Sequence, residues 1–287
     1  MSDQIKRVGV IGAGNIGLGV VSDLLFHGFD VTLVDKQEAI LSDARKEITK
    51  TLRFASIIDK RLKPVTDEKE LAERLVVTSD LNKVSECDYV IENITEKRNL
   101  KLGLYQELDK ICREEVCFAA NTSCISITEI GGWTNRAGQI LGIHFMNPSY
   151  LKMTVEVIRG DYTTEETLGV ADMVLKAMGK DYVVVKDFPG FVSNRVSHLF
   201  MNEAAFVVQD QLASPADVDK IFKECFGHKM GPLETADLIG LDTVVFSLEV
   251  LYESFQDPKY RCCPLLKKMV AGGQLGKKVK RGFFDYK

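Results

Sequence analysis

Short apolar runs alternate with segments of helical spacing over the first two thirds of the chain. The runs predicted as strands cover residues 8–11, 29–34, 76–78, 89–91, 116–120, 141–145, 154–158 and 182–186. Because segments with helical patterns separate most of these runs, we expect an α/β fold with a doubly wound, largely parallel sheet.

Two interruptions of this alternation divide the chain. Residues 38–74 are charged and have helical spacing, with a turn at Pro64-Val65-Thr66-Asp67, so they predict a helical hairpin inserted between strands. After Asp187-Phe188-Pro189-Gly190 the helical pattern continues and β patterns nearly vanish. A length of 287 residues suits about two domains of roughly 150 residues. We therefore expect one domain over residues 1–189 and an all-α domain over residues 190–287.

The first predicted strand runs into Gly12-Ala13-Gly14-Asn15-Ile16-Gly17, and apolar residues at helical spacing follow. A strand, a glycine turn and a helix in this order are typical of a Rossmann-type dinucleotide site. Gly12 permits the turn, Gly14 lets the backbone approach a pyrophosphate, and Gly17 lets the helix pack on the strand. The helix begins with Asn15 and Ile16, and its amino end carries partial positive charge. These five residues are therefore predicted to bind a dinucleotide.

Asp35 ends the second predicted strand, 18 residues after Gly17. Its carboxylate can accept hydrogen bonds from both ribose hydroxyls, and it would repel a 2′-phosphate. The adjacent Lys36 weakens this preference, because a cation tolerates the phosphate. The balance favours NAD over NADP as the cofactor.

Composition and charge exclude several classes of protein. Hydrophobic residues make up 45% of the chain and charged residues 27%, as in an ordinary globular protein. A chain with a net charge of -4 and no Lys/Arg block does not support sequence-independent binding to a phosphate backbone, so we expect no nucleic acid partner. No apolar run approaches the roughly 20 residues of a membrane span, and no signal peptide is visible. We expect a cytoplasmic protein with no membrane contact.

The seven cysteines are scattered and form no CxxC pair. For a cytoplasmic chain this pattern favours free thiols over disulfides. It also argues against a zinc site, so we expect no metal.

His144 ends an apolar strand, at the place where open α/β sheets bind ligands. A single histidine is more often structural than catalytic. Glu156, twelve residues later, is the only acid that we expect inside an apolar strand, where a carboxylate needs a partner to offset its burial. We predict that Glu156 pairs with His144 and orients it as a general base. The alternative is that Glu156 faces solvent from an edge strand.

Two further polar residues are candidates for substrate contact. Ser123 follows another strand, where its hydroxyl can bond a substrate oxygen or cap the next helix. Asn194 follows the domain boundary and is expected to face a cleft between the domains. Spacing alone does not decide between these roles.

Several separate motifs occur in order along the whole chain, at residues 12–17, 121–123, 144–148, 187–195, 227–234, 257–261 and 281–286. With Glu156, these motifs resemble the L-3-hydroxyacyl-CoA dehydrogenase family, most closely its single-chain 3-hydroxybutyryl-CoA dehydrogenase form. The resemblance implies NAD-dependent conversion of a 3-hydroxyacyl thioester to a 3-ketoacyl thioester. It also implies a substrate between a Rossmann domain and a helical domain, and a homodimer through the helical domain.

The resemblance also implies roles for individual residues. His144 is the general base, Glu156 stabilises its imidazolium form, and the polar side chains of Ser123 and Asn194 hold the substrate oxygen and the histidine. Glu96 and Lys101 match positions that contact the cofactor on its nicotinamide side, although their own pattern is that of a solvated helix face.

The chain also differs from the family pattern. The family holds the CoA nucleotide with a serine and a lysine seven residues apart, and the matching positions here are Arg53 and Lys60. Only the lysine is kept. The stretch after Pro148, residues 149–154, is more polar than in the family. The length and polarity of the acyl group are therefore left open.

The differences in the CoA-binding positions suggest one alternative to a CoA substrate, and two further alternatives stay open. The first is a biosynthetic dehydrogenase whose hydroxyacyl group is carried by an acyl carrier protein, because such a substrate lacks the adenine nucleotide. The second is a dehydrogenase of a free small hydroxy acid. The third is a non-catalytic NAD-binding protein, which the presence of all four candidate catalytic residues disfavours.

Apolar residues in the helical region indicate an oligomer. They cluster in two segments, at residues 200–207 and 244–251. Two such faces exceed what a domain of about 98 residues easily buries by itself. We therefore expect the homodimer that the resemblance implies.

Overall fold

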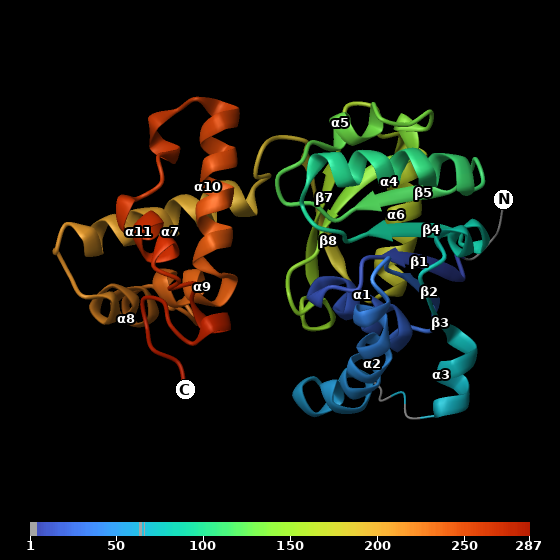
Figure 1. Ribbon diagram of the computed structural model, residues 1–287, viewed down its shortest axis with the longest axis horizontal. Helices are drawn as coiled ribbons and strands as arrows, with labels where there is room; N and C mark the ends of the chain where they lie inside the picture. The colour runs from blue at the N-terminus through green and yellow to red at the C-terminus, as the bar shows by residue number, and fades with distance from the viewer. Residues whose placement is uncertain (1–4, 63–64, 66) are drawn as a thin grey trace. The chain divides into compact units, whose positions relative to one another are not determined.

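The computed structural model describes residues 5–62, 65 and 67–287 and contains an eight-stranded sheet (Figure 1). The strands are β1 (Arg7–Ile11), β2 (Asp30–Val34), β3 (Leu75–Thr78), β4 (Tyr89–Glu92), β5 (Cys117–Ala120), β6 (Ile140–His144), β7 (Thr154–Arg159) and β8 (Asp181–Lys186). Their order across the sheet is β3-β2-β1-β4-β5-β6-β7-β8. Every neighbouring pair is parallel except β6 with β7. The predicted doubly wound, largely parallel sheet is confirmed.

Helices cover both faces of this sheet. On one face, α1 (Asn15–Phe26) and α6 (Glu165–Ala177) pack against alternate strand residues such as Val10 and Leu33, which are fully buried. On the other face lie α4 (Arg98–Ile111) and α5 (Ile127–Gly131), and the ring of Tyr105 in α4 contacts that of Phe118 in β5. The two layers hold the carboxyl ends of the parallel strands in place.

The insertion after β2 consists of α2 (Glu38–Ile58) and α3 (Glu68–Arg74), and Figure 1 shows both helices beyond the β3 edge of the sheet. A buried apolar stripe along α2, including Ile48 and Leu52, explains why this charged helix stays attached. Asp67 caps α3 by accepting hydrogen bonds from two backbone N–H groups. The predicted limits are confirmed, because α2 begins at Glu38 and α3 begins after Asp67 and ends at Arg74, while α2 itself already ends at Ile58. Pro64 and Thr66 of the predicted turn lie outside the described residues.

The chain divides into two compact units, the first ending at Asp187 and the second beginning at Phe188. The second unit contains α7 (Ser193–Gln209), α8 (Pro215–Cys225), α9 (Pro232–Ile239), α10 (Leu241–Phe255) and α11 (Pro264–Ala271). Helix α7 contacts each of the other four. In α9, the buried Asp237 accepts hydrogen bonds from the N–H groups of Phe283 and Phe284, which ties the end of the chain to this unit.

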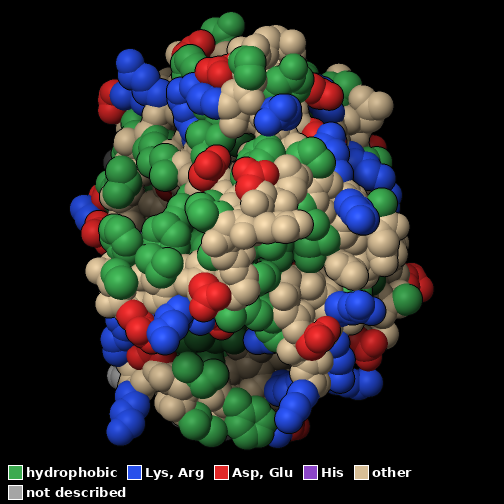
Figure 2. All heavy atoms as spheres, turned by 90° about the vertical axis from the view of Figure 1, so that its left-hand side faces the viewer, with side chains coloured by type: hydrophobic (Ala, Val, Ile, Leu, Met, Phe, Trp, Pro, Cys, Tyr) green, Lys and Arg blue, Asp and Glu red, His purple; other side chains and the backbone are tan. Residues whose placement is uncertain are grey.

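The apolar faces of α7 and α10 are mostly buried within the helical unit. Met201 and Leu248 lie in its core, with α9 and α11 packed over them, while Phe246 is 46% exposed. Phe200, Phe206, Val207 and Val250 are partly exposed as well, so the expectation that these two faces exceed what the unit can bury stays a prediction. Other apolar side chains remain exposed on this unit, among them Leu212 and Phe226. Figure 2 shows hydrophobic side chains on one face of the molecule, among charged side chains of both signs.

The cysteines of the chain are free thiols, and burial raises the pKa of Cys87 to about 11. A buried thiol of this kind is a poor nucleophile. None of the helices in the described part of the chain is long and apolar enough to cross a membrane. Within the same residues, no group of three or more His, Cys, Asp and Glu side chains is arranged to hold a metal ion.

Candidate active site

The glycine turn after β1 depends on the absence of side chains at two positions. Gly12 has a φ of +99°, and a β-carbon there would lie 2.7 Å from the backbone oxygen of Asn93. A β-carbon on Gly17 would lie 1.9 Å from the backbone oxygen of Gly12, so only glycine lets α1 begin here. Gly14 faces open space, with no such atom within 4 Å. The turn is therefore tight at Gly12 and Gly17, and it leaves room for a ligand at Gly14.

The amino end of α1 and Asp35 together fit a dinucleotide. No side chain caps α1 at Gly14, so none neutralises the positive end of the helix, which starts with Asn15 and Ile16. Asp35 Oδ2 accepts a hydrogen bond of 2.9 Å from the N–H of Ala13, which places the carboxylate beside the turn. A helix end suits a pyrophosphate, and a carboxylate beside it suits the ribose of NAD.

His144 and Glu156 are paired across the one antiparallel ladder of the sheet, between β6 and β7. The distance from His144 Nδ1 to Glu156 Oε2 is 3.0 Å, and the two side chains are only 7% and 13% exposed. Strand β7 lies between β6 and β8, so the alternative of an edge strand with Glu156 facing solvent is excluded. The predicted pair exists because this ladder sets the two side chains directly opposite each other.

Ser123 contacts the other nitrogen of the same imidazole, with 3.1 Å between Ser123 Oγ and His144 Nε2. The helix that follows, α5, is capped by Ser126 instead. The capping role considered for Ser123 is therefore wrong, and its hydroxyl lies on the imidazole. Ser123, His144 and Glu156 form one continuous chain of polar contacts.

This chain of contacts can support proton transfer at Nε2. When Nδ1–H donates to the Glu156 carboxylate, the lone pair of the imidazole lies on Nε2, on the side of Ser123. A hydroxyl group that meets Nε2 there can lose its proton to His144. The positive charge that forms is balanced by Glu156 within a largely buried pair.

Glu96 accepts hydrogen bonds from the loop that carries Ser123. The donors to Glu96 Oε1 are the N–H groups of Ser123 at 3.0 Å, Cys124 at 3.0 Å and Ile125 at 3.3 Å, and the hydroxyl of Thr122. The carboxylate therefore holds the loop beside the imidazole. Its side chain is 24% exposed, and its predicted contact with the cofactor stays a prediction.

Lys101 is fully buried among oxygen atoms. Its Nζ lies 2.7 Å from each carboxylate oxygen of Glu92 and 3.5 Å from Glu96 Oε2. It also donates to the backbone oxygen of Asn121 at 3.3 Å. A direct contact between Lys101 and a cofactor would require this cluster to open, and that contact stays a prediction.

Glu92 is the buried residue that sequence reasoning missed. The predicted strand stops at residue 91, whereas β4 continues to Glu92, so the expectation that Glu156 is the only acid in an apolar strand is wrong. Burial raises the pKa of Glu92, and the ammonium group of Lys101 opposes that shift. The available signal was an acid directly after an apolar run, with a lysine nine residues later on the next helix.

Asn194 belongs to the helical unit, where it lies in the first turn of α7. Its backbone oxygen is 3.0 Å from Nδ1 of His198, a hydrogen bond within that helix. Its predicted contacts with the substrate and the catalytic histidine stay predictions.

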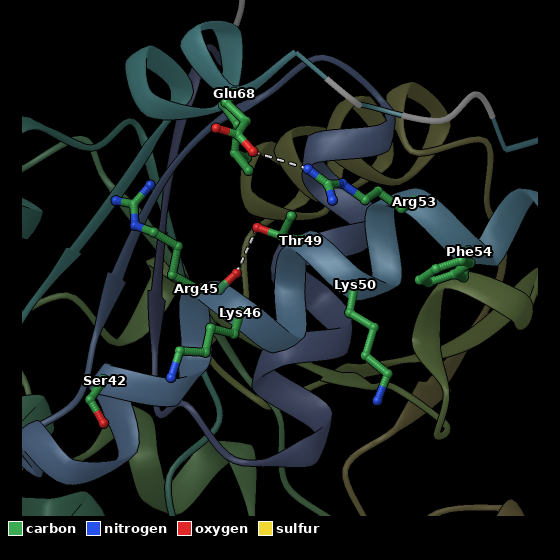
Figure 3. A pocket seen from close by; sticks show the side chains of 9 residues that line it. Ser42, Arg45, Lys46, Thr49, Lys50, Arg53, Phe54 and Glu68 are labelled. Carbon is green, nitrogen blue, oxygen red and sulfur yellow. Dashed lines mark hydrogen bonds and ion pairs between the residues drawn. The ribbon is translucent and has the colours of Figure 1, made fainter.

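Lys60 lies exposed in the turn after α2, and its predicted CoA contact stays a prediction. A cavity of about 650 Å³ lies on the insertion formed by α2 and α3 (Figure 3), and Lys60 is not among the residues that line it. Arg53, which replaces the family serine, lines this cavity and pairs with Glu68 of α3 at 3.0 Å. Because the carboxylate of Glu68 already balances its charge, Arg53 attracts a phosphate group less strongly than an unpaired cation would.

A Rossmann-type sheet with a glycine turn, a carboxylate beside that turn and a largely buried His–Glu pair is typical of an NAD-dependent dehydrogenase. The family model of the 3-hydroxyacyl-CoA dehydrogenase NAD binding domain matches residues 7–188, and that of the C-terminal domain matches residues 190–286. The chain therefore belongs to the 3-hydroxyacyl-CoA dehydrogenase family, as the resemblance of its motifs implied.

Individual relatives match over nearly the whole chain. The probable 3-hydroxybutyryl-CoA dehydrogenase of Bacillus subtilis is 41% identical over 283 residues, which cover 99% of this chain and 98% of the relative. The 3-hydroxybutyryl-CoA dehydrogenase of Bradyrhizobium diazoefficiens is 38% identical over 287 residues, with coverage of 100% and 97%. Among solved structures, the (S)-3-hydroxybutyryl-CoA dehydrogenase of Ralstonia eutropha has a TM-score of 0.91 at 37% identity, with coverage of 99% and 100%. The family, the fold and the use of NAD are thereby confirmed.

Proposed function

We propose that this protein interconverts a short-chain 3-hydroxyacyl-CoA and the matching 3-ketoacyl-CoA, with NAD as the hydride carrier. The observation that carries the proposal is the buried contact chain Ser123–His144–Glu156, with distances of 3.1 and 3.0 Å, in the unit that also carries the glycine turn. A short acyl chain is supported by the relatives, whose names specify 3-hydroxybutyryl-CoA.

His144 is the general base of this reaction. Its Nε2 takes the proton of the substrate hydroxyl, and the C3–H bond breaks with its electron pair as the carbonyl forms. NAD, when bound, supplies the acceptor for that hydride. In the reverse direction the imidazolium returns its proton to the carbonyl oxygen as a hydride is delivered to C3.

The residues around His144 stabilise charge and hold the substrate. Glu156 balances the imidazolium, because its carboxylate is already 3.0 Å from Nδ1 before the proton arrives. We assign the Ser123 hydroxyl to the substrate oxygen at C3, since it lies next to Nε2. Asn194 is proposed to complete this contact from the helical unit.

The cofactor contacts that we propose lie at two places. The backbone of residues 12–17, with Gly12, Gly14, Asn15, Ile16 and Gly17, binds the pyrophosphate at the open end of α1. Asp35 binds the adenine-side ribose. Glu96 and Lys101 are proposed for the nicotinamide side.

The proposal is tested by following NADH oxidation with acetoacetyl-CoA. We expect turnover with the CoA thioester and none with free acetoacetate. The proposal would be overturned if NADH were oxidised with neither the CoA thioester nor the carrier-bound acetoacetyl thioester.

A second candidate is the same reaction on an acyl carrier protein thioester. The observation in its favour is the pair of Arg53 and Glu68, because Arg53 stands where the family has a serine that binds the CoA nucleotide. Of the two family residues at this site, only the lysine is kept, as Lys60. Comparing kcat/KM for the two acetoacetyl thioesters decides between them. A higher value with the CoA thioester selects the first proposal.

We further propose that residues 1–189 form the cofactor domain and that residues 190–287 form a helical domain for substrate contact and dimerisation. The exposed apolar side chains of the helical unit support a homodimer, including Val196, Leu212 and Phe226, which are 64%, 79% and 66% exposed. Sedimentation at micromolar concentration is expected to show a dimer, and a monomer would contradict the proposal. The cytoplasmic location stays a prediction.

A further inference from the structure

We propose that Glu92 is a positioning residue of the dehydrogenation, acting through Lys101 and Glu96 on the loop that presents Ser123 to His144. This inference rests on the proposed function, since it concerns the geometry of the proposed base. Glu92 does not touch the imidazole. Its role would be to keep Glu96 available to the loop.

Glu92 is held in place from several directions. Its Oε1 accepts a hydrogen bond of 2.7 Å from the N–H of Ile94, and its Oε2 accepts one of 3.3 Å from the hydroxyl of Tyr105. Lys101 Nζ lies 2.7 Å from both oxygens, and neither side chain of this ion pair has any exposed area. A carboxylate fixed this firmly also fixes the position of the ammonium group.

Lys101 connects this pair to the loop in two ways. It donates to the backbone oxygen of Asn121, two residues before Ser123, and it lies 3.5 Å from Glu96 Oε2. The ammonium group is therefore 0.8 Å nearer to Glu92 than to Glu96, from the difference between 3.5 and 2.7 Å. Glu96 consequently keeps its other oxygen, Oε1, for the loop.

The loop depends on that oxygen. Glu96 Oε1 accepts from the N–H groups of Ser123, Cys124 and Ile125, which turns the loop so that Ser123 Oγ reaches His144 Nε2 at 3.1 Å. Without the charge of Glu92, Glu96 would be the one carboxylate left in this cluster to balance Lys101. The carboxylate is then expected to move toward the ammonium group and to shift the loop.

A shift of this kind affects the rate more than the binding of substrate. A misplacement of about 1 Å in a catalytic constellation costs roughly a hundredfold in rate. The glycine turn and Asp35 belong to other elements, so the proposed contacts with the pyrophosphate and the adenine-side ribose are expected to be kept. Glu96 and Lys101 are the proposed contacts on the nicotinamide side, so some loss of NAD affinity is expected there.

The chain offers a matched control in a second buried ion pair, Asp109 with Arg136. Arg136 Nε lies 2.8 Å from Asp109 Oδ1, and the side chains of Asp109 and Arg136 are 9% and 7% exposed. Asp109 lies on α4, the helix that also carries Lys101. Arg136 donates to the backbone oxygens of Arg113 and Cys112, which are not part of the contact chain to His144. Breaking this pair removes a comparable ion pair without touching the loop.

The experiment compares Glu92→Gln with Asp109→Asn in kcat, KM for acetoacetyl-CoA, NAD affinity and thermal unfolding. At saturating NADH we expect Glu92→Gln to lower kcat by roughly tenfold to a hundredfold, with KM for acetoacetyl-CoA within about threefold of wild type. The Kd of NAD is measured separately, because it reports on the proposed nicotinamide contacts of Glu96 and Lys101. Asp109→Asn is expected to lower thermal stability to a similar extent and to leave kcat unchanged.

A double-mutant cycle with Ser123→Ala separates positioning from general damage. If Glu92 acts through Ser123, Glu92→Gln changes kcat less than twofold once Ser123 is alanine, because the contact is already lost. Equal effects of Glu92→Gln in the two backgrounds would overturn the proposal, and so would equal kcat losses in Glu92→Gln and Asp109→Asn.

Two further results keep the test decisive. If Glu92→Gln does not fold, the same cycle is run with Glu92→Asp, which keeps the charge but shortens its reach and is expected to lose less activity than Ser123→Ala. An inactive wild-type protein refutes the proposed function, whereas an active wild type with an unaffected Glu92 variant refutes this inference alone.

Discussion

Replacing Glu156 by glutamine tests the central feature of the proposed mechanism, the charge beside the catalytic imidazole. The substitution keeps the shape of the side chain and removes its negative charge. In the proposed mechanism the imidazole donates from Nδ1 to the carboxylate, which lies 3.0 Å away. During the reaction the imidazole becomes positive, so the carboxylate stabilises the transition state more than the ground state.

The expected size of this effect follows from the geometry of the pair. Two unit charges about 4 Å apart interact by about 4 kcal/mol at an effective dielectric constant of about 20, and we take this as the upper value for the largely buried pair. A hydrogen bond to a charged group contributes about 2 kcal/mol, which is a lower value. A loss of about 2 to 4 kcal/mol lowers kcat by roughly 30-fold to 900-fold.

The assay is NADH oxidation with acetoacetyl-CoA at saturating cofactor, which gives kcat and KM for wild type and variant. The matched control is Glu165→Gln, because Glu165 pairs with Arg159 of the same strand β7 but is 77% exposed. The control is expected to keep the wild-type kcat, as an exposed ion pair contributes little. A kcat of Glu156→Gln within threefold of wild type would refute the reasoning. A raised KM with an unchanged kcat would show that Glu156 serves binding instead.

Four other substitutions test separate parts of the structure. His144→Gln is expected to lower kcat at least about a hundredfold with unchanged NAD affinity, and full turnover would exclude His144 as the base. Asp35→Asn should weaken NAD binding in a fluorescence titration by roughly tenfold, by loss of a charged hydrogen bond, and an unchanged Kd would place the ribose elsewhere. Leu24→Ala, in the fully buried core, should lower the free energy of unfolding in urea by about 2–5 kcal/mol, and a loss below about 1 kcal/mol would contradict the packing. The carboxylate of Asp23, which pairs with the imidazole of His27, raises the pKa of His27 above its usual 6.5, so charged His27 stabilises the fold below about pH 6.5 and this contribution is lost as the pH rises through the raised pKa. The difference in melting temperature between wild type and His27→Gln should therefore be largest near about pH 6 and shrink toward about pH 8, and a constant difference would disprove the link.

The apolar pattern predicts all eight strands. Strands covered on both faces appear as continuous apolar runs, and the edge strand β8 has an apolar run of its own, although it is largely exposed. The glycine turn is also predictable from local sequence, since the φ of Gly12 and the close approach at Gly17 exclude side chains there. The pairing of His144 with Glu156 can also be predicted from the sequence. Only twelve residues separate them, and two adjacent strands of that length can place them opposite each other.

Other features depend on contacts that local patterns do not encode. Glu92 looks like the polar end of a short strand, and only the helix packed over β4 brings Lys101 to it. The apolar faces of α7 and α10 look unpartnered in sequence, yet the helices that follow bury most of them. In both cases the partner is supplied by another element of the fold.

The sequence by itself determined the strands, the glycine turn, the choice of NAD and the candidate base with its acid, because each depends on a local pattern or on neighbouring strands. Only the tertiary structure decided that Ser123 contacts His144 instead of capping α5, and that Glu96 and Lys101 join Glu92 in one cluster. These contacts come from separate strands and loops that the parallel sheet aligns at one edge. Their distances follow from packing, which no spacing along the chain specifies.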